Sequence, residues 1–171
     1  MKMRENLGEM TKLATVCGLL LAWAGLGLAQ ERELPKGVQA ATDGKVWGAL
    51  VYSATGEALP LPAGVPKNLS DLHERLSKIF KLSRHEVLGQ HTQDIFRQYE
   101  SWVVPSKDLF LKIDSKGPTD DGTGMHLSVQ VWRQQEVLVK TDVVLRAGSP
   151  LIIGGPNWRE GRLVFVLQLL K

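Results

Sequence analysis

The last third of the chain, residues 125–170, alternates apolar and polar positions with a period of two. The segments MHLSVQVW at 125–132 and VLVKTDVVL at 137–145 place their apolar side chains mainly on one face, whereas LVFVLQLL at 163–170 is apolar on both faces. Period-two alternation predicts strands, and a strand that is apolar on both faces is typical of a central position in a sheet. The pattern therefore predicts an antiparallel meander that the upstream chain covers.

The segment GGPNWREG at 154–161 interrupts this pattern before the last strand. One interpretation is a wide loop or bulge, because glycine permits unusual backbone angles and Pro156 blocks strand pairing. The other is a rigid projecting loop that presents Trp158 and Arg159, two residue types enriched at binding hot spots.

Upstream of the meander, the sequence predicts a buried strand and one amphipathic helix. KVWGALVY at 45–52 is apolar on both faces, and a proline-rich connector follows at 53–66. Asn68 or Ser70 is a suitable N-cap for the helix. Its apolar positions recur at helical spacing and predict that it packs across the sheet, and they are Leu69, Leu72, Leu76, Ile79 and Phe80.

The pattern is ambiguous between residues 83 and 104. We expect a strand at each end of this stretch, although a short helix at 92–99 is an alternative. The predicted strands are at 86–90, 100–104 and 109–114, followed by a hairpin loop at 115–124. The expected fold class is α+β: a predominantly antiparallel sheet covered by one helix, in a single domain over residues 45–171.

The first 29 residues have the pattern of a secretory signal peptide. Lys2, Arg4 and Lys12 precede an apolar run at 13–28, and small residues stand at the end of this run. We expect cleavage after Ala29, a flexible leader at 30–44 and no membrane span afterwards. An uncleaved anchor is the alternative.

Composition and charge exclude several kinds of chemistry. The only cysteine, Cys17, lies in the predicted signal peptide, so the mature chain would have no thiol nucleophile, disulfide or cysteine-ligated metal. A formal net charge of +3 is too small to indicate nucleic-acid binding. The predicted signal peptide means that the protein is expected to be exported to the periplasm or secreted.

No motif for catalysis or metal binding is present. The sequence has no GxSxG and no HExxH, and no histidine pair has the i, i+4 spacing of a helical zinc site. The Asp-rich loop at 114–121 lacks the residue order of a calcium loop, and a solvated hairpin tip is the simpler interpretation. We expect no catalytic residue, metal or cofactor. The candidates considered were the histidines His73, His85, His91 and His126 and the carboxylates Glu86, Glu100 and Asp108.

Tryptophans provide the candidate binding residues. Trp47 and Trp102 lie in apolar strand context and are predicted to be core residues. Trp132 and Trp158 lie at strand ends, where an aromatic side chain serves either as a lid over the core or as an anchor for a partner. Together with Arg159, Trp132 and Trp158 form the predicted partner-binding set.

The run SPLIIGGPNWREGRLVFVL, preceded by WVVPSKDLFLKI and LSKIFKL, resembles a pattern in uncharacterised exported proteins of bacteria. Its apolar pair, Gly-Gly, loop, Gly-Arg and final apolar strand are similar to the end of some secretin-type outer-membrane domains. The resemblance implies a periplasmic partner or assembly factor, and it carries over no functional residue.

The expected function is that of a non-enzymatic envelope protein that binds another protein, in a secretion or pilus system for example. Edge strands available for β-augmentation are one expected means of binding. One alternative is a module that binds glycans or small ligands through Trp132 and Trp158. Another is a hydrolase whose catalytic residues assemble only in the fold.

Overall fold

The computed structural model describes residues 42–170, which form two antiparallel sheets and a short helix. One sheet, here sheet A, has the strand order β2-β1-β8-β7, and the other, sheet B, has the order β3-β4-β5-β6. The elements in chain order are β1 (Thr42–Ala54), the 3-10 helix η1 (Lys67–Leu69), α1 (Leu72–Phe80), β2 (Arg84–Phe96), β3 (Ser101–Val103), β4 (Leu109–Pro118), β5 (Gly124–Arg133), β6 (Glu136–Arg146), β7 (Leu151–Trp158) and β8 (Gly161–Leu170).

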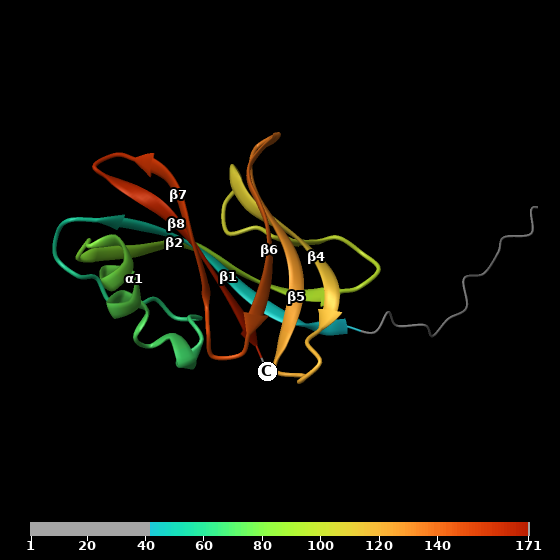
Figure 1. Ribbon diagram of the computed structural model, residues 1–171. Helices are drawn as coiled ribbons and strands as arrows, with labels where there is room; N and C mark the ends of the chain where they lie inside the picture. The colour runs from blue at the N-terminus through green and yellow to red at the C-terminus, as the bar shows by residue number, and fades with distance from the viewer. Residues whose placement is uncertain (1–41, 171) are drawn as a thin grey trace, which may run out of the picture. The chain divides into compact units, whose positions relative to one another are not determined.

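The elements stack in three layers, with α1 on one face of sheet A and sheet B against the other (Figure 1). Alternate residues of the central strand β1 therefore enter two different cores. Val46 and Leu50 pack between the sheets, whereas Trp47 and Val51 pack beneath the helix. Burial on both faces explains why β1 and β8 are apolar throughout almost their whole length.

The helix is held by a narrow apolar stripe. Leu72 and Leu76 are fully buried together with Leu69 of η1, and each such leucine contributes about 2 kcal/mol of transfer free energy. The helix ends at Lys81, whose left-handed conformation (φ 58°) lets its N–H bond to the Ser77 carbonyl. The predicted amphipathic helix is confirmed, and its apolar face covers sheet A.

The predicted fold class is confirmed, because the described chain is mostly antiparallel sheet with one short helix. The single meander is wrong in one respect: β5 and β6 belong to sheet B, whereas β7 and β8 belong to sheet A. The first predicted strand also begins earlier, at Thr42, within the stretch predicted to be a leader. The predicted signal peptide lies outside the described residues.

Two local predictions are confirmed only in part. The strands expected at 86–90 and 100–104 are present as β2 and β3, but β2 continues to Phe96, so the alternative helix at 92–99 is wrong. Of the two forms considered for the segment 154–161, a wide loop or a bulge, the structure has a strand with a bulge-like irregularity, since β7 continues to Trp158 with a shift in pairing between Gly154 and Asn157. Glycine and proline are tolerated here because β7 is an edge strand, whose outer side needs no donors.

Candidate partner-binding cleft

Three aromatic side chains form a cluster on the outer face of sheet B, opposite the side that packs on sheet A. Trp102 comes from β3, Phe110 from β4 and Trp132 from β5. Ring centroids are 5.5 Å apart for Trp102 and Phe110, 6.1 Å for the two tryptophans and 6.4 Å for Phe110 and Trp132. The antiparallel register causes this assembly, because Phe110 lies directly opposite Trp132.

The three rings line an open cleft of about 450 Å³. Val104, which is 45% exposed, adds an aliphatic wall. Lys107, Gln134 and Gln135 supply polar groups. An apolar floor with a few polar groups is the usual composition of a binding site.

The loop at 104–108 forms one wall of the cleft and is fixed from three directions. The Val104 N–H donates to His91 Nδ1 on β2 at 3.0 Å. The Ser106 hydroxyl bonds to the backbone of Leu109. The Gln134 N–H, from the β5–β6 turn, donates to the Asp108 carbonyl at 2.9 Å. The wall is therefore held by hydrogen bonds within the chain.

Gly89 on β2 allows this loop to lie close to sheet A. A Cβ atom at this position would stand 1.9 Å from the Pro105 carbonyl oxygen. Only a residue without a side chain permits this approach, so the cleft depends on a glycine outside it.

One donor at the cleft is both buried and unpaired. The indole Nε1 of Trp132 is buried and has no acceptor among residues 42–170. A buried donor without a partner is an energetic cost of about 1–3 kcal/mol. This cost distinguishes Trp132 from Trp47, whose indole N–H donates to Gln90 Oε1 at 2.9 Å.

The predicted binding residues do not form one site, because Trp158 and Arg159 lie at the tip of the β7–β8 hairpin of sheet A. The Trp158 ring packs edge-on against Tyr52, with centroids 5.2 Å apart. The Arg159 guanidinium lies 4.1 Å from the centre of the same ring. Trp158 is 36% exposed, so it covers the end of the sandwich and also presents an open side.

Two of the three aromatic residues of the cleft were missed by the sequence analysis. Trp102 was predicted to be a core residue, but it points to the outer face of β3 while Val103 enters the core. Phe110 was not singled out. The available signal was an aromatic residue on the polar face of a strand, since Phe110 shares its face with Lys112, and Trp132 shares its face with Gln130.

A second polar cluster lies between α1 and sheet A. His85 Nδ1 is 2.9 Å from the Ser53 hydroxyl, and its Nε2 is 3.0 Å from the Ser77 hydroxyl. Burial, and secondarily the neighbouring His73, lowers the pKa of His85. Ser53 is fully buried and His85 only 2% exposed, so a substrate cannot reach this serine–histidine contact. The cluster instead joins the helix to the sheet.

The other candidate groups are engaged in local contacts. The pKa of Asp121 is held well below its usual range by hydrogen bonds from Thr119, from Thr123 and from Arg146. Its carboxylate therefore organises the β4–β5 turn. Within residues 42–170, no three histidine, cysteine or carboxylate side chains are arranged to hold a metal ion. The candidate carboxylates contact separate partners, namely Glu86 with Arg84, Glu100 with Lys112 and Asp108 with Gln134.

Comparison with known proteins adds no relative: no family model, no curated protein and no solved structure matches this chain. In the part of the chain that the structure describes, no helix has the length and apolar character needed to cross a membrane.

Proposed function

We propose that this protein is a non-enzymatic, exported interaction module that binds a protein of the bacterial envelope through the aromatic cleft on sheet B. The observation that carries this proposal is the position of Trp102, Phe110 and Trp132. They lie on a sheet face whose other residues are largely polar or charged, such as Lys112, Gln130 and Lys140. α1 packs on the opposite side of the molecule (Figure 1). Aromatic side chains grouped on such a face are typical of protein-binding hot spots.

The shape of the cleft favours a protein side chain as its occupant. The Trp102 ring is tilted by 56° to both other rings, so the three rings do not form one flat surface. Its volume is sufficient for one or two apolar side chains. The polar groups of Lys107, Gln134 and Gln135 resemble the rim that surrounds an interface anchor.

Export is supported by the sequence of the first 29 residues, where a positively charged start, an apolar run and small residues follow one another. The partner is therefore expected among proteins that the module meets beyond the inner membrane. The resemblance of the last strands to secretin-type domains supports a partner in a secretion or pilus assembly.

The test is crosslinking of the tagged full chain in its native cells, followed by capture and identification of the attached proteins. The variants Trp132→Ala and Lys107→Glu should lose the partner, because one removes part of the cleft and the other reverses a rim charge. Trp158→Ala is the matched control, since it removes the same side chain elsewhere. Circular dichroism checks that each variant is folded. A partner retained by both cleft variants, or lost only with Trp158→Ala, would refute the assignment of the cleft.

Glycan binding is the second candidate, and one observation favours it. The rings of Phe110 and Trp132 are nearly parallel, with an interplanar angle of 8°, and parallel rings can stack against sugar faces. Titration of soluble oligosaccharides, followed by tryptophan fluorescence, separates the two candidates. A saturable change that is lost in Trp132→Ala would favour the glycan over the protein partner.

A further inference from the structure

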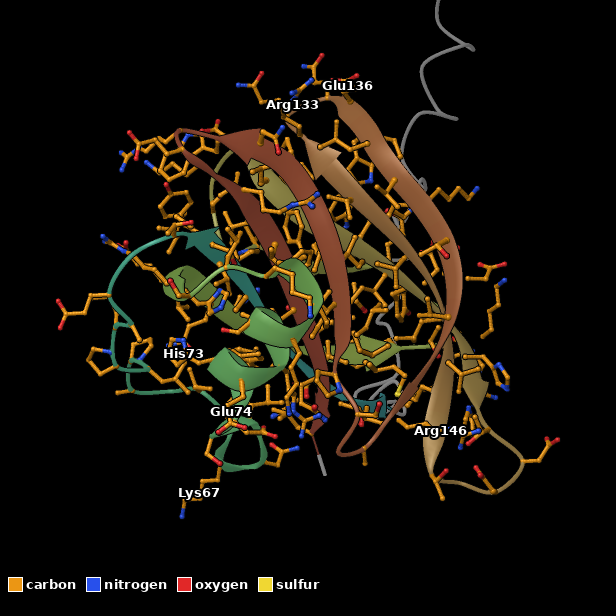
Figure 2. The ribbon with its side chains drawn as sticks, turned by 60° about the vertical axis from the view of Figure 1, so that its left-hand side comes forward. Lys67, His73, Glu74, Arg133, Glu136 and Arg146 are labelled. Carbon is orange, nitrogen blue, oxygen red and sulfur yellow. The ribbon has the colours of Figure 1, made fainter. Side chains whose placement is uncertain are left out.

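The outermost strand of sheet B, β6, has a free pairing edge. Within residues 42–170 it pairs along its length with β5 on one side, and Ala147, the residue after the strand, forms an isolated bridge to Leu169 of β8. Figure 2 labels both ends of this strand, Glu136 beside the β5–β6 turn and Arg146 at the opposite end. An edge of this length exposes a row of unpaired N–H and C=O groups, which natural proteins normally protect.

The other three edges are protected. β7 carries Pro156 and a pairing irregularity, and β3 has only three residues. The edge of β2 is met by the loop at 104–108, through the contact of Pro105 with Gly89. In contrast, β6 contains neither proline nor glycine.

The sequence of β6 is complementary to itself when it runs antiparallel to a second copy. If Thr141 faces Thr141, then Lys140 faces Asp142 and Val139 faces Val143. Each charged residue meets the opposite charge, and each apolar residue meets an apolar one. Opposite charges placed directly across two strands stabilise the pair, whereas like charges destabilise it.

The charges also select this register over its neighbours. Directly opposite residues of two paired strands have their side chains on the same face of the sheet. A two-fold symmetric register must therefore be centred on a single residue, and the alternative registers are centred on neighbouring residues. A centre at Lys140 would place two lysines together, and a centre at Asp142 would place two aspartates together. A centre at Val143 would oppose Lys140 and Arg146. Among the centres from Val139 to Val143, only Thr141 pairs unlike charges.

The residues at this edge are accessible for such pairing. No carboxylate among residues 42–170 lies within ion-pair distance of Lys140, and Asp142 contacts Lys116 at 2.8 Å through side chains that are more than half exposed. Val139 and Val143 are only partly buried where they border the core between the sheets. A second strand would cover both.

We propose that the protein forms a two-fold symmetric dimer in which β6 pairs antiparallel with β6 of a second copy, centred on Thr141. The two copies of sheet B join into one continuous sheet. The pairing irregularity between Val131 and Trp132, which displaces β6 near Leu138, limits the regular part of the ladder to residues 139–143 of each copy. The interface is isologous and lies on an edge that the aromatic cleft does not use.

The first experiment measures dimerisation of the full chain by analytical ultracentrifugation over a range of concentrations. Lys140→Asp places aspartate opposite aspartate, and Asp142→Lys places lysine opposite lysine. Each variant alone should raise the dimer dissociation constant by about thirtyfold, because two attractive pairs become repulsive. A mixture of the two variants should form a heterodimer, since every opposing pair is then aspartate with lysine. A wild-type protein that stays monomeric, or variants that dimerise unchanged, would overturn the proposal.

The second experiment tests the register by disulfide formation in a Cys17→Ala background, which removes the only native cysteine. Thr141→Cys should give a covalent dimer under mild oxidation, because directly opposite Cα atoms lie about 4.5–5.5 Å apart. Val139→Cys is the control on the same face, and its two copies would be separated by about 13 Å along the strands. Equal crosslinking of both variants, or crosslinking of Val139→Cys alone, would refute the register.

Discussion

Replacement of Gly89 tests how the cleft is supported. The backbone of Gly89 does not adopt the left-handed conformation, so alanine is acceptable there apart from its Cβ atom. That atom would lie 1.9 Å from the Pro105 carbonyl oxygen, whereas carbon–oxygen contacts are normally about 3.3 Å or longer. Gly89→Ala must therefore displace the loop at 104–108 by about 1.4 Å, the difference between these contacts.

This displacement would break two hydrogen bonds that hold the loop at 104–108. The hydrogen bonds from Val104 to His91 and from Gln134 to Asp108 contribute about 1 kcal/mol each, and overpacking adds about 1 kcal/mol or more. The free energy of unfolding should fall by about 3 kcal/mol, which lowers the melting temperature by roughly 10 °C for a domain of this size.

Thermal unfolding followed by circular dichroism measures the effect. Gly122→Ala is a suitable control, because a Cβ atom there has no neighbour within 4 Å and only the positive φ of 64° is unfavourable. It should cost about 1 kcal/mol. A Gly89→Ala protein that melts within about 2 °C of the wild type would show that the loop is not held against β2.

Two further predictions concern the layer between α1 and sheet A. Because burial lowers the pKa of His85 below its usual value of 6.5, the unfolded chain binds a proton that the folded chain lacks as the pH falls below that value. The free energy of unfolding should therefore decline below that pH by up to about 1.4 kcal/mol per pH unit. Urea unfolding of His85→Gln, measured between about pH 7.5 and pH 5, should lack this part of the pH dependence. Leu76→Ala removes a fully buried side chain on the face of α1 that packs on sheet A, and it should lower the free energy of unfolding by about 2–5 kcal/mol. A loss below about 1 kcal/mol in urea unfolding would contradict the packing of α1.

The sequence was sufficient to predict the fold class and the helix. Period-two alternation in β4, β5 and β6 identifies the strands, and the apolar stripe from Leu69 to Phe80 identifies α1. The division into two sheets could not be predicted, because alternation defines the two faces of a strand and not its neighbours. The strand predicted at 86–90 lies within β2, but its extension to Phe96 was missed because the sequence RHEVLGQHTQDIF has no regular apolar face.

The cleft could be predicted only in part. Trp132 was recognised because it ends the polar face of its strand, and Phe110 could have been found by the same reasoning. Trp102 was misassigned because its apolar neighbours Val103 and Val104 suggested a buried segment. Its orientation depends on the pairing of β3 with β4, which brings Trp102 opposite Lys112. That pairing is a tertiary contact that a linear pattern does not contain.

The pairing of β1 with β8 affects the order in which the chain folds. The first and last strands of the described chain pair along most of their length, from Lys45 with Leu170 to Ser53 with Arg162. Sheet A, and both cores that it borders, cannot close until the ten residues of β8 are available. Contacts so distant in sequence carry a large loop-closure cost and slow the folding reaction. The topology thus leaves one side of β1 unpaired until β8 has been synthesised, so sheet A forms late in the folding reaction.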